Sequence, residues 1–231
     1  MTDRIIKPII TEDGSHTLYI PGMDEHYHSF HGAIQESTHV FIETGFKALA
    51  KDTVHVLEIG FGTGLNALLT ALEADKSDKM VYYTTLELYP LSEEITNHLN
   101  YPSVLGLDSA KTDMYHRILG AEWLKEEGEF VEITSRFFIR KLHVDFTDYR
   151  FNANYNLIYF DAFAPDKQPE MWTSTLFDSV SNATEEGGIL TTYCAKGVVR
   201  RALIASGFKV ERLPGPPGKR EMLRGTKLLN D

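Results

Sequence analysis

The stretch VHVLEIGFGTGLN, residues 54–66, decides the fold. Its first six residues predict a buried β-strand, and Asn66 to Leu72 predict a helix. Between them, Gly60, Gly62 and Gly64 allow a tight turn and let a ligand approach the backbone closely. A strand, a glycine turn and a helix in this order are typical of α/β proteins, in which ligands lie at the carboxyl ends of the strands. The stretch therefore predicts a ligand site at this turn.

The chain downstream of this unit continues the alternation of strands and helices. Strands are expected at residues 80–88, 137–144, 155–161, 188–193, 208–213 and 221–223, and helices from residue 90, over 110–126 and over 196–206. This alternation predicts a mainly parallel sheet covered by helices on both faces.

The first fifty residues show a different pattern. Residues 5–10 and 16–20 flank a turn at Glu12-Asp13-Gly14 and predict a β-hairpin. Apolar residues between Phe30 and Ala50 recur at spacings that predict an amphipathic helix. We expect residues 1–50 to form an extension that packs on a core domain of residues 51–231.

Composition narrows the class of protein. The chain has 231 residues, of which 42% are hydrophobic and 24% charged, as in soluble globular proteins. Cys194 is the one cysteine, which excludes an intramolecular disulfide and a Cys-rich zinc module. No apolar stretch is long enough for a membrane span, and the N-terminal apolar run is too short for a signal peptide. We therefore expect a cytoplasmic protein that does not engage a membrane.

The glycine turn also indicates the kind of ligand. Its spacing is G-x-G-x-G, Glu58 lies two residues before the first glycine, and the G-x-x-x-x-G-K-[ST] pattern of a triphosphate-binding loop is absent. This arrangement resembles the first motif of class I S-adenosylmethionine (SAM) methyltransferases, which implies a Rossmann-like fold with SAM as the cofactor. An acidic strand end suits SAM because SAM carries an amine and a sulfonium cation but no phosphate. The alternative is a turn whose glycines serve packing alone.

Carboxylates end the neighbouring strands as well. Glu87 ends the next strand, where it can accept hydrogen bonds from ribose hydroxyls. Asp145 follows the third strand and would lie near the adenine, although Asp148 is close enough to compete for this role. Asp161 ends an apolar strand beside the cofactor, where no structural need explains a carboxylate. It could accept a proton from an amine nucleophile or orient it.

The loop after Asp161 carries a longer signature. The run YFDAFAP, residues 159–165, is followed by Pro-Glu-Met-Trp at 169–172. Together they resemble the D-[GA]-F-A-P…P-x-M-W signature of the tRNA 5-methylaminomethyl-2-thiouridine methyltransferase family, which comprises stand-alone MnmD and the methyltransferase half of bifunctional MnmC. Further matches lie at residues 36–43, 57–66 and 218–223, so the resemblance spans nearly the whole chain. MnmC also carries an FAD-dependent oxidase domain; this chain ends at Asp231, and we expect the stand-alone form.

The resemblance implies a reaction and a partner. The reaction is SAM-dependent N-methylation of the 5-aminomethyl group of (2-thio)uridine at the wobble position, in the anticodon region of tRNA. It depends on the enzyme that installs the aminomethyl group. Asp161 would be the catalytic residue, and the cofactor would be bound by Glu58, Gly60, Gly62, Gly64, Asn66, Glu87, Asp145 and Asp161. The alternatives are a small-amine methyltransferase or aminopropyltransferase, and a non-catalytic SAM-binding module.

Substrate contacts are expected from aromatic and basic residues. Phe163 and Trp172 could wall a pocket or stack on a base, although packing of Trp172 on the sheet is an equal alternative. The net charge of −10, taken alone, argues against nucleic acid. However, residues 196–227 carry a local balance of +7, which leaves −17 for the rest. The basic residues expected to meet tRNA are Arg200, Arg201, Lys219 and Arg220.

Histidines are concentrated near the N-terminus. Five of the nine lie between His16 and His39, and no thiols accompany them. Such clusters are usually polar surface, so we expect no metal site.

Overall fold

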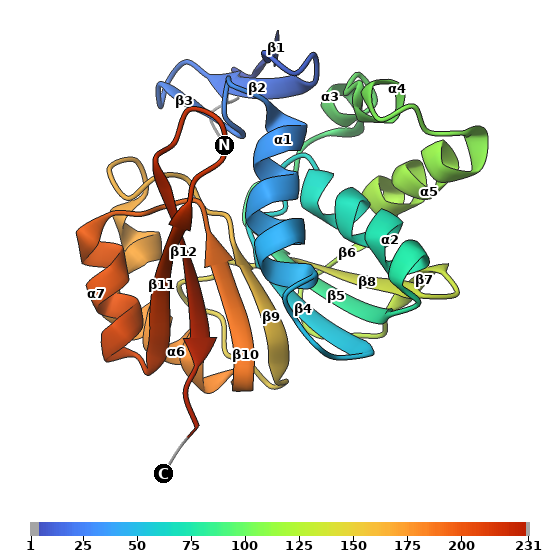
Figure 1. Cartoon of the computed structure of the whole chain (residues 1–231). Helices are drawn as coiled ribbons and strands as arrows, with labels where there is room; N and C mark the ends of the chain where they lie inside the picture. Colours follow the sequence, from blue (N-terminus) through green and yellow to red (C-terminus); the bar gives the residue numbers. More distant parts are fainter. Residues whose placement is uncertain (1–4, 230–231) are drawn as a thin grey trace.

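The computed structural model describes residues 5–229 and is built around a nine-stranded sheet (Figure 1). The strand order is β11-β12-β10-β9-β4-β5-β8-β6, with β7 beside β8. The strands β10, β9, β4, β5, β8 and β6 run parallel, whereas β11, β12 and β7 are antiparallel to their neighbours. The strands are β4 (Thr53–Ile59), β5 (Met80–Glu87), β6 (Trp123–Leu124), β7 (Val131–Thr134), β8 (Phe137–His143), β9 (Tyr155–Phe160), β10 (Thr184–Thr192), β11 (Phe208–Pro214) and β12 (Glu221–Lys227). The prediction of a mainly parallel sheet is confirmed.

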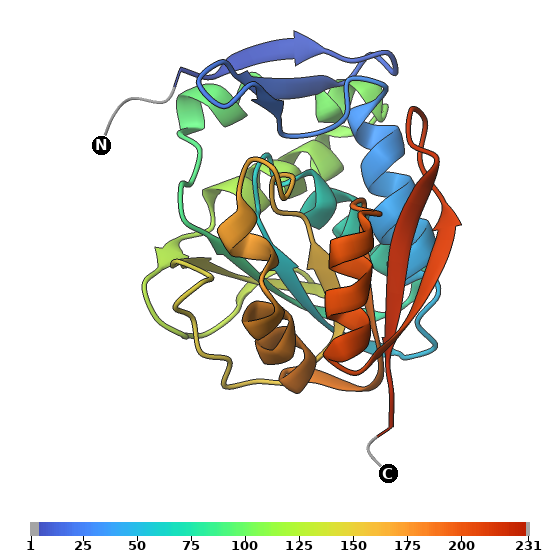
Figure 2. The same ribbon diagram turned by 90° about the vertical axis from the view of Figure 1, so that its left-hand side faces the viewer.

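Helices cover both faces of this sheet, as predicted (Figures 1 and 2). One face packs against α1 (Ala33–Ser37), the π-helix η1 (Thr38–Phe46), α2 (Leu65–Ser77) and α5 (Ser109–Gly120), and the other against α6 (Ser174–Asn182) and α7 (Gly197–Ala205). Alternate residues of each central strand enter different cores: Val56 of β4 joins the α2 side and Leu57 the α6 side. This alternation follows from the two-residue repeat of a strand. No helix within residues 5–229 has the length and apolar character needed to cross a bilayer.

The direction in which the chain adds strands to the sheet reverses between β4 and β9, which are neighbours in the sheet but far apart in sequence. Successive strands are added on one side of β4 as β5 and β8, and on the other side as β9 and β10. Such a reversal leaves a crevice at the carboxyl ends of the two central strands. The candidate site lies there.

The N-terminal segment forms a small antiparallel sheet above these carboxyl ends (Figure 2). It consists of β1 (Lys7–Ile10), β2 (His16–Ile20) and β3 (Glu25–His26), and its first two strands are the predicted hairpin. The helix that follows differs from the prediction, because over η1 its hydrogen bonds widen to the π pattern: the Lys47 N–H donates to the Ile42 carbonyl at 2.9 Å. Phe41 and Phe46 of this helix enter the core shared with α2. The boundary at residue 50 stays a prediction.

The predicted boundaries of several helices and strands are wrong by a few residues. The helix expected over 110–126 ends at Gly120, and Trp123 instead pairs with Lys141 of β8. The last strand continues to Lys227 because β10 and β11 hydrogen-bond to it from both sides. The helix expected from residue 90 is short, and the remaining elements are α3 (Glu93–Thr96), α4 (Tyr101–Val104) and the 3-10 helix η2 (Pro169–Trp172).

Candidate functional site

A cavity of about 460 Å³ opens at the carboxyl ends of the central strands. This volume is within the range of small-molecule sites. Four strand ends line the cavity, and Tyr27 and His28 of the N-terminal segment cover it. The strand ends contribute Gly60 and Gly62 after β4, Glu87 in β5, Asp145 after β8, and Asp161 and Phe163 after β9.

The glycine turn fixes one wall of the cavity. Gly60 has φ +90°, and a Cβ on it would lie 2.8 Å from the Asp161 carbonyl oxygen. Gly62 and Gly64 also have positive φ, and a Cβ on Gly62 would press on the Tyr27 ring. The backbone N–H of Asp161 donates to the Ile59 carbonyl at 3.0 Å, so the two strand ends are tied together. Only glycine fits Gly60 without strain or a clash.

Glu87 and Asp145 lie at the cavity as partly exposed carboxylates. Glu87 Oε2 accepts from the Gly62 N–H at 3.2 Å, and its Oε1 accepts from the Tyr89 N–H at 2.8 Å. Asp145 Oδ1 accepts from the N–H and hydroxyl of Thr147 at 2.8 and 2.7 Å. Asp148 is exposed and does not line the cavity, so the geometry favours Asp145 over it.

Glu58 and Asn66 lie behind the cavity wall and do not line the cavity. Glu58 is 0% exposed and Asn66 2% exposed. Asn66 Nδ2 donates to Glu58 Oε1 at 3.1 Å and to Asp161 Oδ2 at 2.8 Å. The sequence pattern placed both residues beside the cofactor, but Glu58 points to the α2 side of β4, where it contacts Asn66. Burial in this core raises the pKa of Glu58 to about 8.

Asp161 is the carboxylate that joins this buried group to the cavity. Burial raises the pKa of Asp161 well above its ordinary value, the Asn66 hydrogen bond opposes the rise, and the charges of Glu36 and Glu58 add to it. Lys219 lowers the pKa of Asp161 in turn. A carboxylate whose pKa is raised is a stronger base than an ordinary carboxylate and is better suited to accept a proton.

The two aromatic residues of the signature have different environments. Phe163 lines the cavity and meets the Tyr27 ring edge-on, with centroids 5.2 Å apart. Trp172 is 6% exposed and packs against Phe160, and its indole N–H donates to the Phe163 carbonyl at 2.8 Å. Of the two alternatives for Trp172, the structure agrees with packing on the sheet rather than with a pocket wall, because its ring lies in the core and supports the Phe163 loop from behind.

His28 and Tyr27 were not among the predicted site residues. His28 is buried, and its Nε2 lies 2.9 Å from the Thr63 hydroxyl in the glycine turn. Burial lowers the pKa of His28 to about 4, so its ring is neutral at physiological pH. Both residues are distant in sequence from the glycine turn and from Asp161, and no local pattern signals that the N-terminal sheet folds over the turn.

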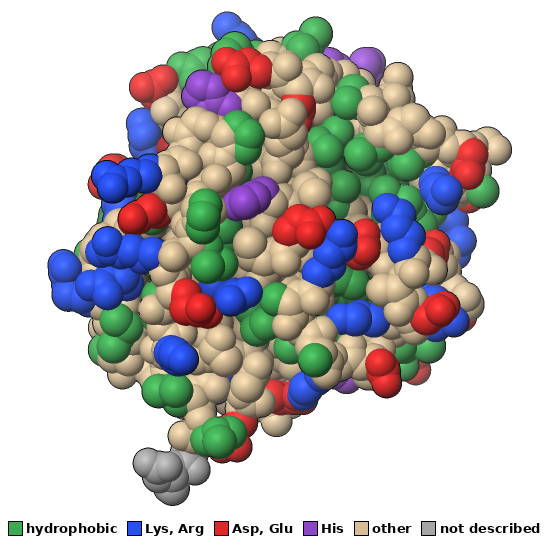
Figure 3. Space-filling view, viewed as in Figure 1, with side chains coloured by type: hydrophobic (Ala, Val, Ile, Leu, Met, Phe, Trp, Pro, Cys, Tyr) green, Lys and Arg blue, Asp and Glu red, His purple; other side chains and the backbone are tan. Residues whose placement is uncertain are grey.

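The four predicted basic residues do not line the cavity. Lys219 forms a 2.5 Å ion pair with the buried Glu36 and lies 3.9 Å from the centre of the Tyr193 ring. Arg201 and Arg220 are exposed and Arg200 is half-buried. Lys and Arg side chains gather over α7 and the adjoining β11–β12 region, on the left of Figure 3. The structure therefore separates a surface basic region from the acidic cavity.

A model of the family described as S-adenosyl-L-methionine-dependent methyltransferase matches residues 110–228 of this chain. Among curated proteins, the chain is similar to the tRNA 5-methylaminomethyl-2-thiouridine biosynthesis bifunctional protein MnmC of Cupriavidus metallidurans, at 30% identity over 94% of this chain and 33% of that protein. It is 33% identical to the protein of the same name from Magnetococcus marinus, over 90% of this chain and 32% of that protein. The chain thus spans about a third of the length of the curated relatives it matches.

Solved structures show the same fold. The crystal structure of MnmC2 from Aquifex aeolicus superposes with a TM-score of 0.75 and 25% identity, and the match covers 100% of this chain and 72% of that one. Spermidine synthase from Thermotoga maritima superposes with a TM-score of 0.59 and 14% identity over 98% of this chain and 70% of that one, which shows a shared fold alone.

Proposed function

Since the chain belongs to the S-adenosyl-L-methionine-dependent methyltransferase family, we propose that it methylates the 5-aminomethyl group of (2-thio)uridine at the wobble position of tRNA. The observation that carries this proposal is the Asp161 carboxylate, which reaches the cavity wall at the carboxyl end of β9. The name of the MnmC relatives, which align over nearly the whole chain, supports the choice of substrate. The proposed activity is cytoplasmic and depends on the enzyme that installs the aminomethyl group.

The cofactor is SAM, and the residues around the cavity fit it. Gly60 and Gly62 line the cavity with no side chain of their own, which leaves their backbone open to a ligand. When bound, SAM supplies a methyl group activated by a sulfonium. We propose that Gly60 and Gly62 contact it through their backbone, that Glu87 accepts hydrogen bonds from ribose hydroxyls, and that Asp145 lies near the adenine. Gly64 shapes the turn, and Glu58 and Asn66 act from behind the wall.

Asp161 serves the amine substrate in this account. An alkylamine is mostly protonated at neutral pH and then has no lone pair with which to attack. A carboxylate at the cavity wall would hold the ammonium group and accept its proton before attack, which frees the lone pair that forms the nitrogen–methyl bond while the sulfur leaves with the electrons of its own bond to that methyl group. Phe163 and Tyr27 flank the same cavity and limit the positions open to the base. Alignment of amine, methyl and sulfur is then the main requirement for the displacement.

Replacement of Glu87 with alanine is expected to raise the Kd for SAM by about 10- to 100-fold. Hydrogen bonds to a charged group contribute about 1.5–3 kcal/mol, and each 1.4 kcal/mol corresponds to about tenfold in affinity. Isothermal titration calorimetry measures the change. Glu94→Ala is the matched control, because Glu94 is exposed and does not line the cavity. Equal affinities of the Glu87 and Glu94 variants would remove Glu87 from the cofactor site.

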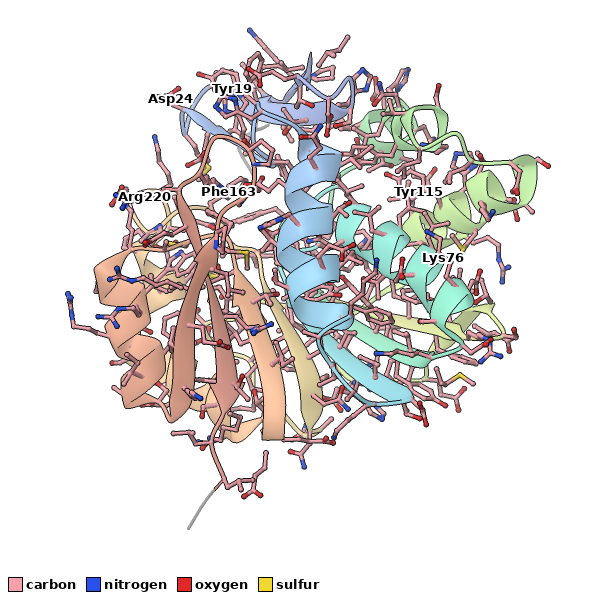
Figure 4. All side chains as sticks on the ribbon, viewed as in Figure 1. Tyr19, Asp24, Lys76, Tyr115, Phe163 and Arg220 are labelled. Carbon is pink, nitrogen blue, oxygen red and sulfur yellow. The ribbon has the colours of Figure 1, made fainter. Side chains whose placement is uncertain are left out.

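The basic region is proposed to contact tRNA phosphates. Changing Arg200 and Arg201 together to glutamate should weaken tRNA binding by about tenfold or more and flatten its dependence on salt, because each phosphate contact releases counterions. Lys76→Glu is the control: Lys76 is exposed on α2 and lies on the opposite side of the molecule from Arg220 in Figure 4. Filter binding at several salt concentrations measures both quantities. Equal slopes for both variants would place the tRNA on another face.

The substrate class is tested by incubating the protein with methyl-labelled SAM, hypomodified bulk tRNA and polyamines in one mixture. Label recovered in the tRNA fraction agrees with the proposal. Label recovered in polyamines would replace it with small-amine methylation, and SAM binding without any transfer would leave a binding module.

A further inference from the structure

A row of three polar side chains runs from the core to the cavity wall. Glu58 is fully buried, Asn66 follows it on the first turn of α2, and Asp161 reaches the cavity. One amide nitrogen, Asn66 Nδ2, donates to both carboxylates, at 3.1 Å to Glu58 and 2.8 Å to Asp161. An amide NH2 has two donor hydrogens, so this arrangement uses both of them.

Further contacts fix the backbone and the side chain of Asn66. The backbone carbonyl of Asn66 accepts the Thr70 hydroxyl at 2.7 Å, and that hydroxyl lies 3.2 Å from the Tyr159 hydroxyl, which ties α2 to β9. Asn66 Oδ1 is buried and has no hydrogen-bond partner within residues 5–229. A buried amide that leaves its acceptor unsatisfied is costly. Its orientation is therefore set by the two carboxylates that take its hydrogens.

We infer that Asn66 is a positioning residue, which fixes the Asp161 carboxylate at the cavity wall in its ionised, proton-accepting form, while Glu58 completes the group as a neutral acid. This inference rests on the proposed role of Asp161 in methyl transfer. It gives Glu58 and Asn66 a part that does not require either of them to touch the cofactor.

Electrostatics favour this division of the protons. Two like charges on one amide are unfavourable, so one carboxyl of the pair keeps its proton. Burial, the largest cause, raises the pKa of Glu58 to about 8, and the nearby hydroxyls of Thr85 and Tyr83 and the Asn66 amide only partly oppose it. Burial, again the largest cause, raises the pKa of Asp161 as well, but Asp161 borders the cavity, and the Asn66 hydrogen bond and the Lys219 cation oppose this rise and favour its ionised form. Glu58 therefore carries the proton at neutral pH.

Replacing Asn66 with alanine tests the positioning role. Loss of the donor raises the pKa of Asp161, so the acidic limb of the pH profile of kcat/KM should move to higher pH by about one unit. Transfer at pH 7 then falls about tenfold, while the Kd for SAM changes by less than about threefold. A profile that keeps its midpoint, or a loss explained by SAM affinity alone, would overturn the inference.

Asn156 offers a matched control for this substitution. It is also 2% exposed and also uses both amide groups, accepting from the His55 N–H and donating to the Thr53 carbonyl, but it lies outside the cavity on β9. Asn156→Ala removes a similar amide and is expected to lower stability without moving the pH profile. An equal shift of the profile in both variants would show a general structural effect and contradict the positioning role.

Glu58→Gln gives a readout that does not depend on activity. In the folded protein Glu58 keeps a proton that it loses in the unfolded chain above about pH 4.5, so the contribution of Glu58 to wild-type stability falls as pH rises from about 5 to 8. Glutamine cannot titrate. The slope of the free energy of urea unfolding against pH should therefore decrease by the amount that corresponds to about one bound proton. An unchanged slope would show that Glu58 is already ionised. The unfolding measurement tests the protonation of Glu58 without any activity assay. A wild-type protein that fails to methylate tRNA would refute the proposed function and leave this measurement unaffected.

Discussion

Replacement of Asp161 with alanine is expected to lower methyl transfer by about 10²- to 10⁴-fold, the range that a positioned general base contributes. The amine would then be held less well and would keep its proton. The Kd for SAM should change by less than about threefold, because Gly60, Gly62, Glu87 and Asp145 still line the cavity. Single-turnover kinetics with saturating SAM, together with calorimetric SAM titration, separate the two effects.

Asp166 supplies the control for this experiment. It lies five residues later in the same loop, is exposed, and pairs with Lys196 on the surface. Asp166→Ala should transfer methyl groups at the wild-type rate, since exposed ion pairs contribute little. Wild-type turnover by Asp161→Ala would remove the carboxylate from the reaction, whereas loss of SAM binding in this variant would make it a cofactor ligand instead.

Gly60→Ala is expected to abolish measurable SAM binding, with a rise in Kd of about 100-fold or more. The added methyl group would lie 2.8 Å from the Asp161 carbonyl oxygen, so the turn and the β9 end must separate. The positive φ of Gly60, +90°, adds backbone strain of about 1–3 kcal/mol. Calorimetric titration measures the affinity, and urea unfolding measures the loss of stability.

Gly106→Ala distinguishes strain from the clash. Gly106 also has a positive φ, +63°, but a Cβ there meets nothing within 4 Å. This control shares the strain and should bind SAM like the wild type. If Gly60→Ala also kept its affinity, the glycine turn would not approach the cofactor.

The fold could be predicted largely from local patterns. The apolar runs at residues 54–59 and 155–161 and the glycine turn place β4, β9 and α2 correctly, because each signal lies within one element and its neighbours. Long-range pairing decides the rest. Trp123 follows a helical pattern but forms a strand because Lys141 is beside it, and β12 is extended by partners on both sides.

The sequence predicts which strand ends form the site, but it does not predict the direction in which each side chain points. Glu58 and Gly60 are two residues apart, yet Glu58 is fully buried and Gly60 lines the cavity. The sequence indicates which strand ends meet, whereas the side that each residue faces depends on the packing of α2. Trp172 shows the same limit, since its sequence context left a pocket-facing ring and a ring packed on the sheet as equal alternatives, and the structure has the packed ring. Tyr27 directly follows β3, in a segment that only tertiary folding brings over the cavity.

Net charge was informative only after it was divided along the chain. The overall value of −10 hides a basic C-terminal region and an acidic remainder. In the structure, the carboxylates Glu87, Asp145 and Asp161 border the cavity, while Arg201 and Arg220 are exposed on the surface. This separation agrees with the proposal that a cationic cofactor binds in the cavity while tRNA phosphates contact the surface basic region.

The most direct measurement locates the transferred methyl group within tRNA. The purified protein is incubated with SAM and a tRNA that carries 5-aminomethyl-(2-thio)uridine at the wobble position, and the product is digested to nucleosides and analysed by mass spectrometry. The account predicts one added methyl group on the aminomethyl nitrogen of the wobble nucleoside, formed by the wild-type protein and lost in Asp161→Ala. A methyl group on any other nucleoside, or no transfer to this tRNA by a protein that binds SAM, would contradict it.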